Sequence, residues 1–92
     1  MITALVLMNV RRDAVNSTAQ ALLGIPGVAE VYSVTGEYDL VAVLHLAHYE
    51  DLADVVTGRM IAIDSILRTQ TMMAFKAYSR EDLEQAWDIG VE

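Results

Sequence analysis

Two segments of the chain predict β-strands that are apolar on both faces. In Ile2–Val10 and in Asp39–Leu46, hydrophobic residues occupy both of the alternating series of positions. Successive side chains of a strand point to opposite faces of its sheet, so strands of this composition have to be covered on both sides. A chain of 92 residues, which we assign to one domain over residues 1–92, can supply helices for only one of those faces. The other face must therefore be covered by something outside the chain.

The composition limits what could pack against the second face of the sheet. Hydrophobic residues make up 54% of the chain and the mean hydropathy is +0.35, which is more apolar material than a small monomer can bury. The longest unbroken apolar runs, such as Ala4–Met8, are far shorter than the roughly 18 residues that span a bilayer, so no membrane partner is expected. Arg11 and Arg12 follow the first apolar run instead of preceding it, which argues against a secretory signal. A second copy of the chain is therefore the best remaining candidate to pack against that apolar face.

Charge and residue usage exclude several function classes. The formal net charge is −7 and the six Lys and Arg residues are not clustered, so direct DNA or RNA binding is not expected. The absence of cysteine excludes disulfides and thiolate metal sites, and it fits a cytoplasmic location. The five methionines are typical of core and interface positions, and we predict neither a metal nor a cofactor.

Hydrophobic periodicity and turn residues divide the rest of the chain into further elements. Gly24 ends a helix, Pro26–Gly27 turns the chain, and Gly36 marks a hairpin corner. Besides the two apolar strands, the predicted elements are helices at Ala14–Leu23 and His48–Met60, strands at Val28–Thr35 and Ile66–Tyr78, and a C-terminal helix at Ser79–Gly90. The order β-α-β-β-α-β predicts an α+β, ferredoxin-like plait over residues 2–78, with the C-terminal helix (79–90) as an addition.

Such a plait has helices on one face of its sheet only, and in a monomer the other face should be polar. The predicted strands are largely apolar on that face as well. A few hundred Å² of apolar surface, at about 25 cal/mol per Å², contributes several kcal/mol to association before its costs are subtracted. We therefore predict an obligate homodimer that packs sheet against sheet, of the dimeric α/β-barrel type.

Two stretches carry a resemblance to a known family. The sequence G-I-P-G-V-A-E-V-Y-S-V-T-G-E-Y-D-L-V-A-V, from Gly24 to Val43, and the later R-T-Q-T, from Arg68 to Thr71, resemble the effector-binding domain of the Lrp/AsnC (feast/famine) transcriptional regulators. The resemblance covers Ile2 to about Tyr78, and the G-x-Y-D corner is its most specific element. Full members carry an N-terminal helix-turn-helix domain, whereas this chain starts at the first strand of the effector domain. We therefore expect a stand-alone member.

The resemblance implies partners and a binding site. It implies dimers that assemble into octameric or similar rings. It also implies a small effector, often an amino acid, that binds where two dimers meet. Co-assembly with a full-length Lrp/AsnC regulator would be one route of action. The residues that it places in or near the effector pocket are Gly36, Glu37, Tyr38, Asp39, Leu40, Thr69 and Thr71.

These residue types suit an amino-acid ligand. Backbone N–H groups around Gly36 could bind its carboxylate, and Asp39 could accept a charge-assisted hydrogen bond from its ammonium. Thr69 and Thr71 would offer hydroxyl groups, and Tyr38 an amphipathic wall. Structural roles remain open for all of them: an ordinary turn glycine, an aspartate that bonds the hairpin backbone, an interface tyrosine and strand threonines.

The predicted function is that of an oligomeric, amino-acid-binding module that modulates transcription indirectly, without binding DNA and without catalysis. Two alternatives stay open. The first is a small ferredoxin-like enzyme, such as a cofactor-independent monooxygenase, for which His45 is the only plausible base. The second is a purely structural assembly module with a vestigial pocket.

Overall fold

The computed structural model of the protein describes residues 1–80. Its elements, in chain order, are β1 (Ile2–Val10), a 3₁₀ turn (Arg12–Ala14), α1 (Val15–Leu23), β2 (Val28–Ser33), β3 (Leu40–Leu46), α2 (Glu50–Ala53) with its π-helical continuation (Asp54–Met60), and β4 (Ile66–Met73). Within residues 1–80, no helix has the length and apolar character needed to cross a membrane.

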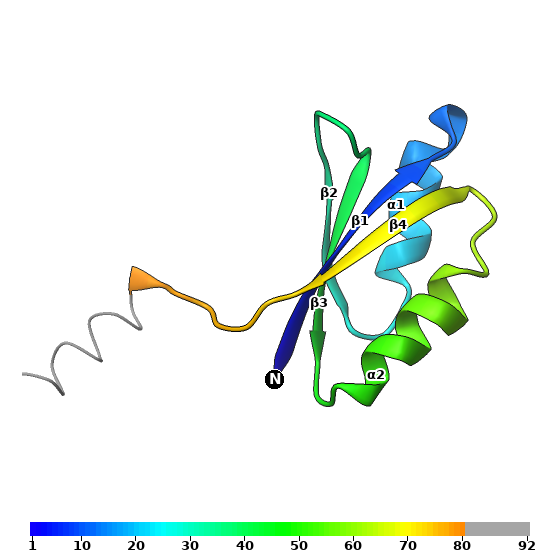
Figure 1. The fold of residues 1–92 in the computed structure, drawn as a ribbon. Helices are drawn as coiled ribbons and strands as arrows, with labels where there is room; N and C mark the ends of the chain where they lie inside the picture. Colours follow the sequence, from blue (N-terminus) through cyan, green and yellow to red (C-terminus); the bar gives the residue numbers. More distant parts are fainter. Residues whose placement is uncertain (81–92) are drawn as a thin grey trace, which may run out of the picture.

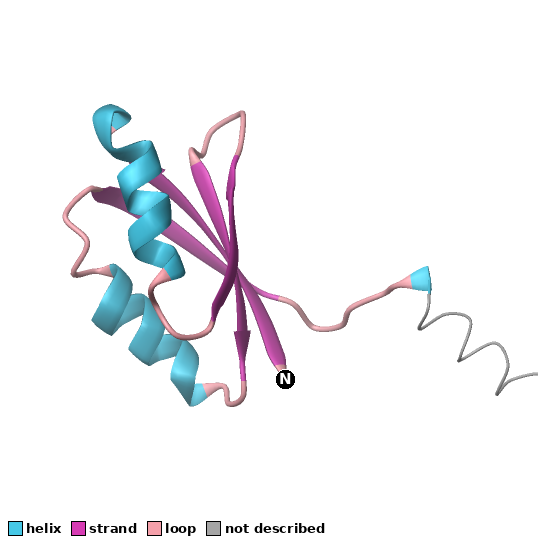
Figure 2. Ribbon diagram, turned by 180° about the vertical axis from the view of Figure 1, so that it is seen from behind, coloured by secondary structure: helices cyan, strands magenta, loops and turns pink. Residues whose placement is uncertain are grey.

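The strands form one antiparallel sheet in the order β2-β3-β1-β4, and both helices cover the same face of it (Figure 1, Figure 2). This arrangement confirms the ferredoxin-like plait. The two central strands, β1 and β3, are those that the sequence predicts to be apolar on both faces. Central strands have a neighbour on each side, so their side chains are the ones most shielded by the sheet itself.

The core lies between the sheet and the two helices. Cross-strand partners share a face of a sheet, and the pairs Val6↔Ala42 and Met8↔Leu40 point toward the helices. Leu22 of α1 and Met60 of the π-helical segment close the core from the other side. The buried residues that line it are Ala4, Val6, Met8, Val10, Leu22, Ile25, Leu40, Ala42, Leu44, Leu46, Val55 and Met60.

The opposite face of the sheet is the helix-free face, and its centre is apolar. The pairs Leu5↔Val43 and Leu7↔Val41 occupy that centre, and all four side chains are only partly buried in the single chain. At the two edges of this face lie Tyr32 of β2 and Met72 of β4, which are 48% and 42% exposed. The apolar helix-free face that the sequence predicts is therefore present in the fold.

The fourth strand is shorter than the sequence pattern predicts. It ends at Met73 instead of Tyr78, so the prediction of a strand through Tyr78 is wrong. The last bond to the sheet runs from the Ala74 N–H to the Thr3 carbonyl oxygen, at 2.9 Å. Because the neighbouring strand β1 begins at Ile2, it offers almost no backbone partner beyond that point.

Smaller differences occur elsewhere. β2 ends at Ser33 instead of Thr35, and α2 begins at Glu50 instead of His48. The second half of that helix, Asp54–Met60, has π-helical hydrogen bonding. The predicted helix at Ser79–Gly90 lies, beyond Arg80, outside the described residues, so the single-domain assignment over residues 1–92 stays a prediction.

Candidate functional site

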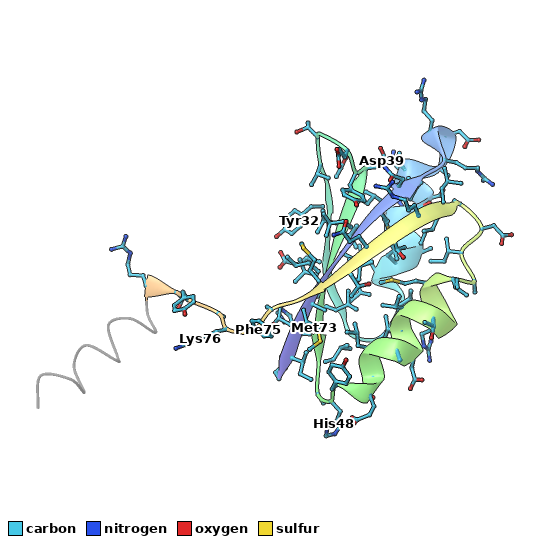
Figure 3. All side chains as sticks on the ribbon, in the orientation of Figure 1. Tyr32, Asp39, His48, Met73, Phe75 and Lys76 are labelled. Carbon is cyan, nitrogen blue, oxygen red and sulfur yellow. The ribbon has the colours of Figure 1, made fainter. Side chains whose placement is uncertain are left out.

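The corner between β2 and β3 is the first candidate site. It comprises residues 34–39 and lies beside the C-terminal end of β1, as Figure 3 shows for Asp39. A hydrogen bond from the Val34 N–H to the Asp39 carbonyl oxygen, at 3.0 Å, closes its base. Gly36 has φ of 106°, a left-handed conformation that other residues adopt only at a cost. Apart from Gly36 and its two neighbours in the sequence, no heavy atom of the described chain lies within 4 Å of the place that a Cβ at Gly36 would take, so the tip of the corner is open.

Asp39 connects this corner to β1. Its Oδ2 accepts hydrogen bonds from the backbone N–H of Val10, at 2.9 Å, and from Asn9 Nδ2, at 3.5 Å. Its own N–H donates to the Met8 carbonyl oxygen at 2.9 Å, and Asn9 Nδ2 also donates to the carbonyl oxygen of Glu37 at 2.7 Å. The carboxylate therefore has a structural role toward the adjacent strand, not toward its own hairpin. Within residues 1–80 its second oxygen, Oδ1, has no hydrogen-bond partner.

Tyr38 reaches across the end of β1 to β4. Its hydroxyl group donates to Gln70 Oε1 at 2.5 Å and accepts from Arg68 Nη2 at 3.1 Å. The Arg68 guanidinium also lies over the tyrosine ring, 5.2 Å from the centroid, in cation–π geometry. Arg68 and Gln70 stand opposite Asn9 and Leu7 in the register, so this cluster lies on the rim of the helix-free face.

The remaining predicted site residues are placed differently. Thr69 and Thr71 are exposed and stand opposite Met8 and Val6, which face the helices. They therefore point to the other side of β4 from Arg68 and Gln70, and the single chain does not bring them to the corner. Leu40 is 1% exposed, and its side chain belongs to the core. The sequence reasoning missed Arg68 and Gln70, although the period-two alternation of R-T-Q-T puts them on one face together.

Polar groups elsewhere on the helix-free face pair with their neighbours. His45 Nδ1 is 3.2 Å from Thr3 Oγ1, near the end of β3 that is remote from the corner. The Tyr32 hydroxyl donates to the Glu30 carboxylate, and this bond together with the negative charge of Glu30 raises the pKa of Tyr32. Within residues 1–80, no three His, Asp or Glu side chains come close enough together to bind a metal ion.

A second candidate site is a groove between α2 and β4, which we call the α2–β4 groove. It has a volume of about 500 Å³ and is mostly apolar. Its lining residues are Tyr49, Glu50, Leu52, Ala53, Val56, Thr57 and Thr71. Thr71 therefore faces this groove, on the helix-covered side of the sheet.

Comparison with known proteins decides the family. Residues 3–83 match the family described as the Lrp/AsnC ligand binding domain, a span that contains the corner and nearly the whole of the sheet. The chain belongs to this family. The resemblance inferred from the G-x-Y-D corner and the R-T-Q-T stretch is thereby confirmed.

Relatives of this Lrp/AsnC domain include longer regulators. The uncharacterized HTH-type transcriptional regulator PF0250 of Pyrococcus furiosus is 30% identical over 82 residues, which are 86% of this chain and 55% of that protein. The chain spans about half the length of the curated relatives that it matches.

Solved structures share the fold. TTHA0845 from Thermus thermophilus is 49% identical with a TM-score of 0.82, and the match covers 87% of this chain and 100% of that one. The feast or famine regulatory protein Rv3291c from M. tuberculosis has the same fold, with 23% identity and a TM-score of 0.71. The match covers 87% of this chain and 54% of that one. That protein was solved in complex with L-methionine.

The bonds of Asp39 predict a stability effect. We expect Asp39→Ala to lower the free energy of unfolding by about 1.5–3 kcal/mol, because the Val10 N–H loses a charged acceptor. Glu37→Ala is the matched control, since only the backbone oxygen of Glu37 is bonded and the variant keeps it. Urea unfolding of both variants measures the difference. Equal losses would contradict a structural role for the Asp39 carboxylate.

Proposed function

We propose that this Lrp/AsnC domain is an oligomeric, amino-acid-binding module of the cytoplasm that modulates transcription indirectly, without binding DNA itself. The observation that carries the proposal is the match of residues 3–83 to a ligand-binding domain, because that span includes both the corner and the helix-free face. The curated relatives are transcriptional regulators, which supports a regulatory role over a catalytic one.

The corner offers complementary groups to an amino acid. The open backbone at Gly36 and the Arg68 guanidinium can bind a carboxylate. Asp39 Oδ1, to which no residue of 1–80 donates, and the exposed Glu37 can bind an ammonium group. These groups line only one side of a ligand. A second copy would have to supply the other side, so the proposed pocket lies between subunits.

The proposal gives indirect roles to the other predicted site residues, which are Leu40, Thr69 and Thr71. Leu40 anchors the corner from the core, where its side chain is buried. Thr69 and Thr71 are exposed on the helix-covered side of the edge strand, where Thr71 lines the α2–β4 groove, so they could contact only a ligand that is held by the corner of a neighbouring copy. We propose that dimers assemble into a closed ring, such as an octamer, as the family resemblance implies. A full-length Lrp/AsnC regulator, which carries the same domain, is a further candidate for co-assembly.

The amino-acid proposal is tested by isothermal titration with each of the twenty amino acids. We expect heat of binding for at least one. Asp39→Asn should weaken that binding about tenfold or more, because it removes the charge while an amide oxygen can still accept from the Val10 N–H. Asp54→Asn, on the exposed side of the second helix, is the matched control and should bind normally. No heat with any of the twenty would contradict the proposal and favour a structural assembly module.

Self-association is proposed through the helix-free face. We expect sedimentation velocity at micromolar concentration to show a dimer or larger species. Leu7→Lys should dissociate it, because a charge in the centre of an apolar interface cannot be solvated. Leu23→Lys on α1, where the side chain is 54% exposed, is the control and should leave the assembly unchanged. A single-chain species of the unaltered protein would contradict this part of the proposal.

The net negative charge of the chain is the reason why we expect no DNA binding. With a net charge of −7, phosphates are repelled and few counterions can be released on contact. We expect a gel-shift titration of the purified chain at physiological salt to give no retarded band. A specific band that survives excess competitor DNA would contradict the proposal.

A further inference from the structure

The chain that follows β4 is an extended arm. Residues 74–78, which we call the arm, leave the sheet on the side away from the helices (Figure 1, Figure 2), and Figure 3 shows Phe75 and Lys76 along it. Phe75 is fully exposed and Tyr78 is 74% exposed. Within residues 1–80, no backbone hydrogen bond joins residues 75–78 to the sheet. Exposed aromatic rings and unpaired backbone groups both suit the arm to a partner.

The outer edge of β2 has backbone groups that are free to pair. β2 stands at one end of the sheet order, so no strand of residues 1–80 bonds to the N–H and C=O groups that point outward from it. On the helix-free side this edge carries Glu30 and Tyr32, and Tyr32 is 48% exposed. Aromatic rings on neighbouring strands stabilise the pairing of those strands. The β2 edge can therefore accept both the backbone and an aromatic side chain of an added strand.

The two edges of the helix-free face carry opposite charges. The acid Glu30 lies on β2, and the base Arg68 lies on β4, which leads into Lys76 of the arm. Two sheets that stack face to face about a two-fold axis can place β4 of one copy over β4 or over β2 of the other. The first arrangement brings the like charges of Arg68 and Lys76 to the same edge. The second brings both bases to the edge that carries Glu30, so charge complementarity favours β2.

The arm is placed to reach the β2 edge of a second copy and not that of its own chain. Within one chain, β1 and β3 separate β4 from β2, and the arm departs from the sheet (Figure 1, Figure 2). A second copy packed on the helix-free face lies on the side toward which the arm points. An extended chain advances about 3.3 Å per residue, so the arm spans roughly 16 Å, whereas stacked sheets are about 10 Å apart. The arm is therefore long enough to cross to the other sheet.

The geometry points to an exchange of arms between copies: residues 74–78 of one chain pair with the outer edge of β2 in a second copy, with Lys76 beside Glu30 and an aromatic ring of the arm against Tyr32. This inference rests on the self-association proposed above but not on ligand binding. Symmetry makes the contact reciprocal, so that a dimer contains it twice. The arms thereby determine which edges of the two apolar faces meet, which a broad apolar surface alone does not determine.

The absence of native cysteine allows a direct test by thiol cross-linking. One full-length variant carries Ala77→Cys in the arm, and a second, with a tag that changes its mass, carries Ala29→Cys on the exposed edge of β2. Both variants keep Lys76 and Glu30. After mixing and exchange of subunits, we expect a short bifunctional thiol reagent to join the two chains about tenfold faster than the control pair, because docking holds the two thiols near each other. The control replaces Ala29→Cys with Met72→Cys, at the β4 edge of the same face, where the side chain is 42% exposed.

The outcomes separate this inference from the proposed function. Suppose that the protein is an oligomer but the Ala77→Cys chain cross-links to the Ala29→Cys chain no faster than to the Met72→Cys control. That result would overturn the arm exchange and leave self-association intact. A single-chain species in sedimentation would overturn both.

An exchange of charges gives a second test. We expect Lys76→Glu to weaken association about tenfold, because the new carboxylate meets Glu30 of the other copy. Glu30→Lys in the same chain makes the two charges opposite again and should recover most of the affinity. The matched control combines Lys76→Glu with Asp54→Lys, which changes the net charge equally on the exposed side of the second helix and should recover none. Equal recovery in the two double variants, or recovery in neither, would overturn the inference.

Discussion

The pairing of β1 with β3 is the interaction on which the rest of the structure depends. The register runs from Ile2↔Leu46 to Met8↔Leu40, and it puts one apolar series of each strand under the helices and the other on the helix-free face. The first series builds the core with Leu22 and Met60. The second series leaves an apolar surface that a single chain cannot cover, because both helices lie on the other side (Figure 2). Folding and the proposed self-association therefore draw on the same two strands.

The corner is held at the end of this strand pair by polar contacts. Asp39 and Asn9 connect the corner to β1, and Tyr38 extends the connection to Arg68 on β4. The segment that joins β2 and β3 thus also contacts β1 and β4, which fixes its polar groups at the rim of the helix-free face, where we propose that a ligand binds. A ligand bound there between two copies would change the stability of their contact, since occupancy and assembly are linked whenever one state binds more tightly.

The two edges of the sheet differ in what they offer to partners. β2 is short and carries the polar pair Glu30 and Tyr32, whereas β4 has exposed threonines and leads into residues 74–78, where Phe75 is fully exposed. Exposed edges and apolar segments tend to associate with other chains.

The sequence alone determined the order of the helices and strands within residues 2–73 and the family. Alternation along a strand and helical periodicity are local properties, so Ile2–Val10 and the apolar third strand could be recognised without their neighbours, and the G-x-Y-D corner identified the ligand-binding domain. The tertiary structure decided which side chains meet. Asp39 bonds to Val10 instead of its own hairpin, and Tyr38 meets Arg68 instead of Thr69, because the register between strands sets those contacts. The same reason explains the early end of β4: a strand continues only as far as its neighbour offers backbone partners, and β1 begins at Ile2.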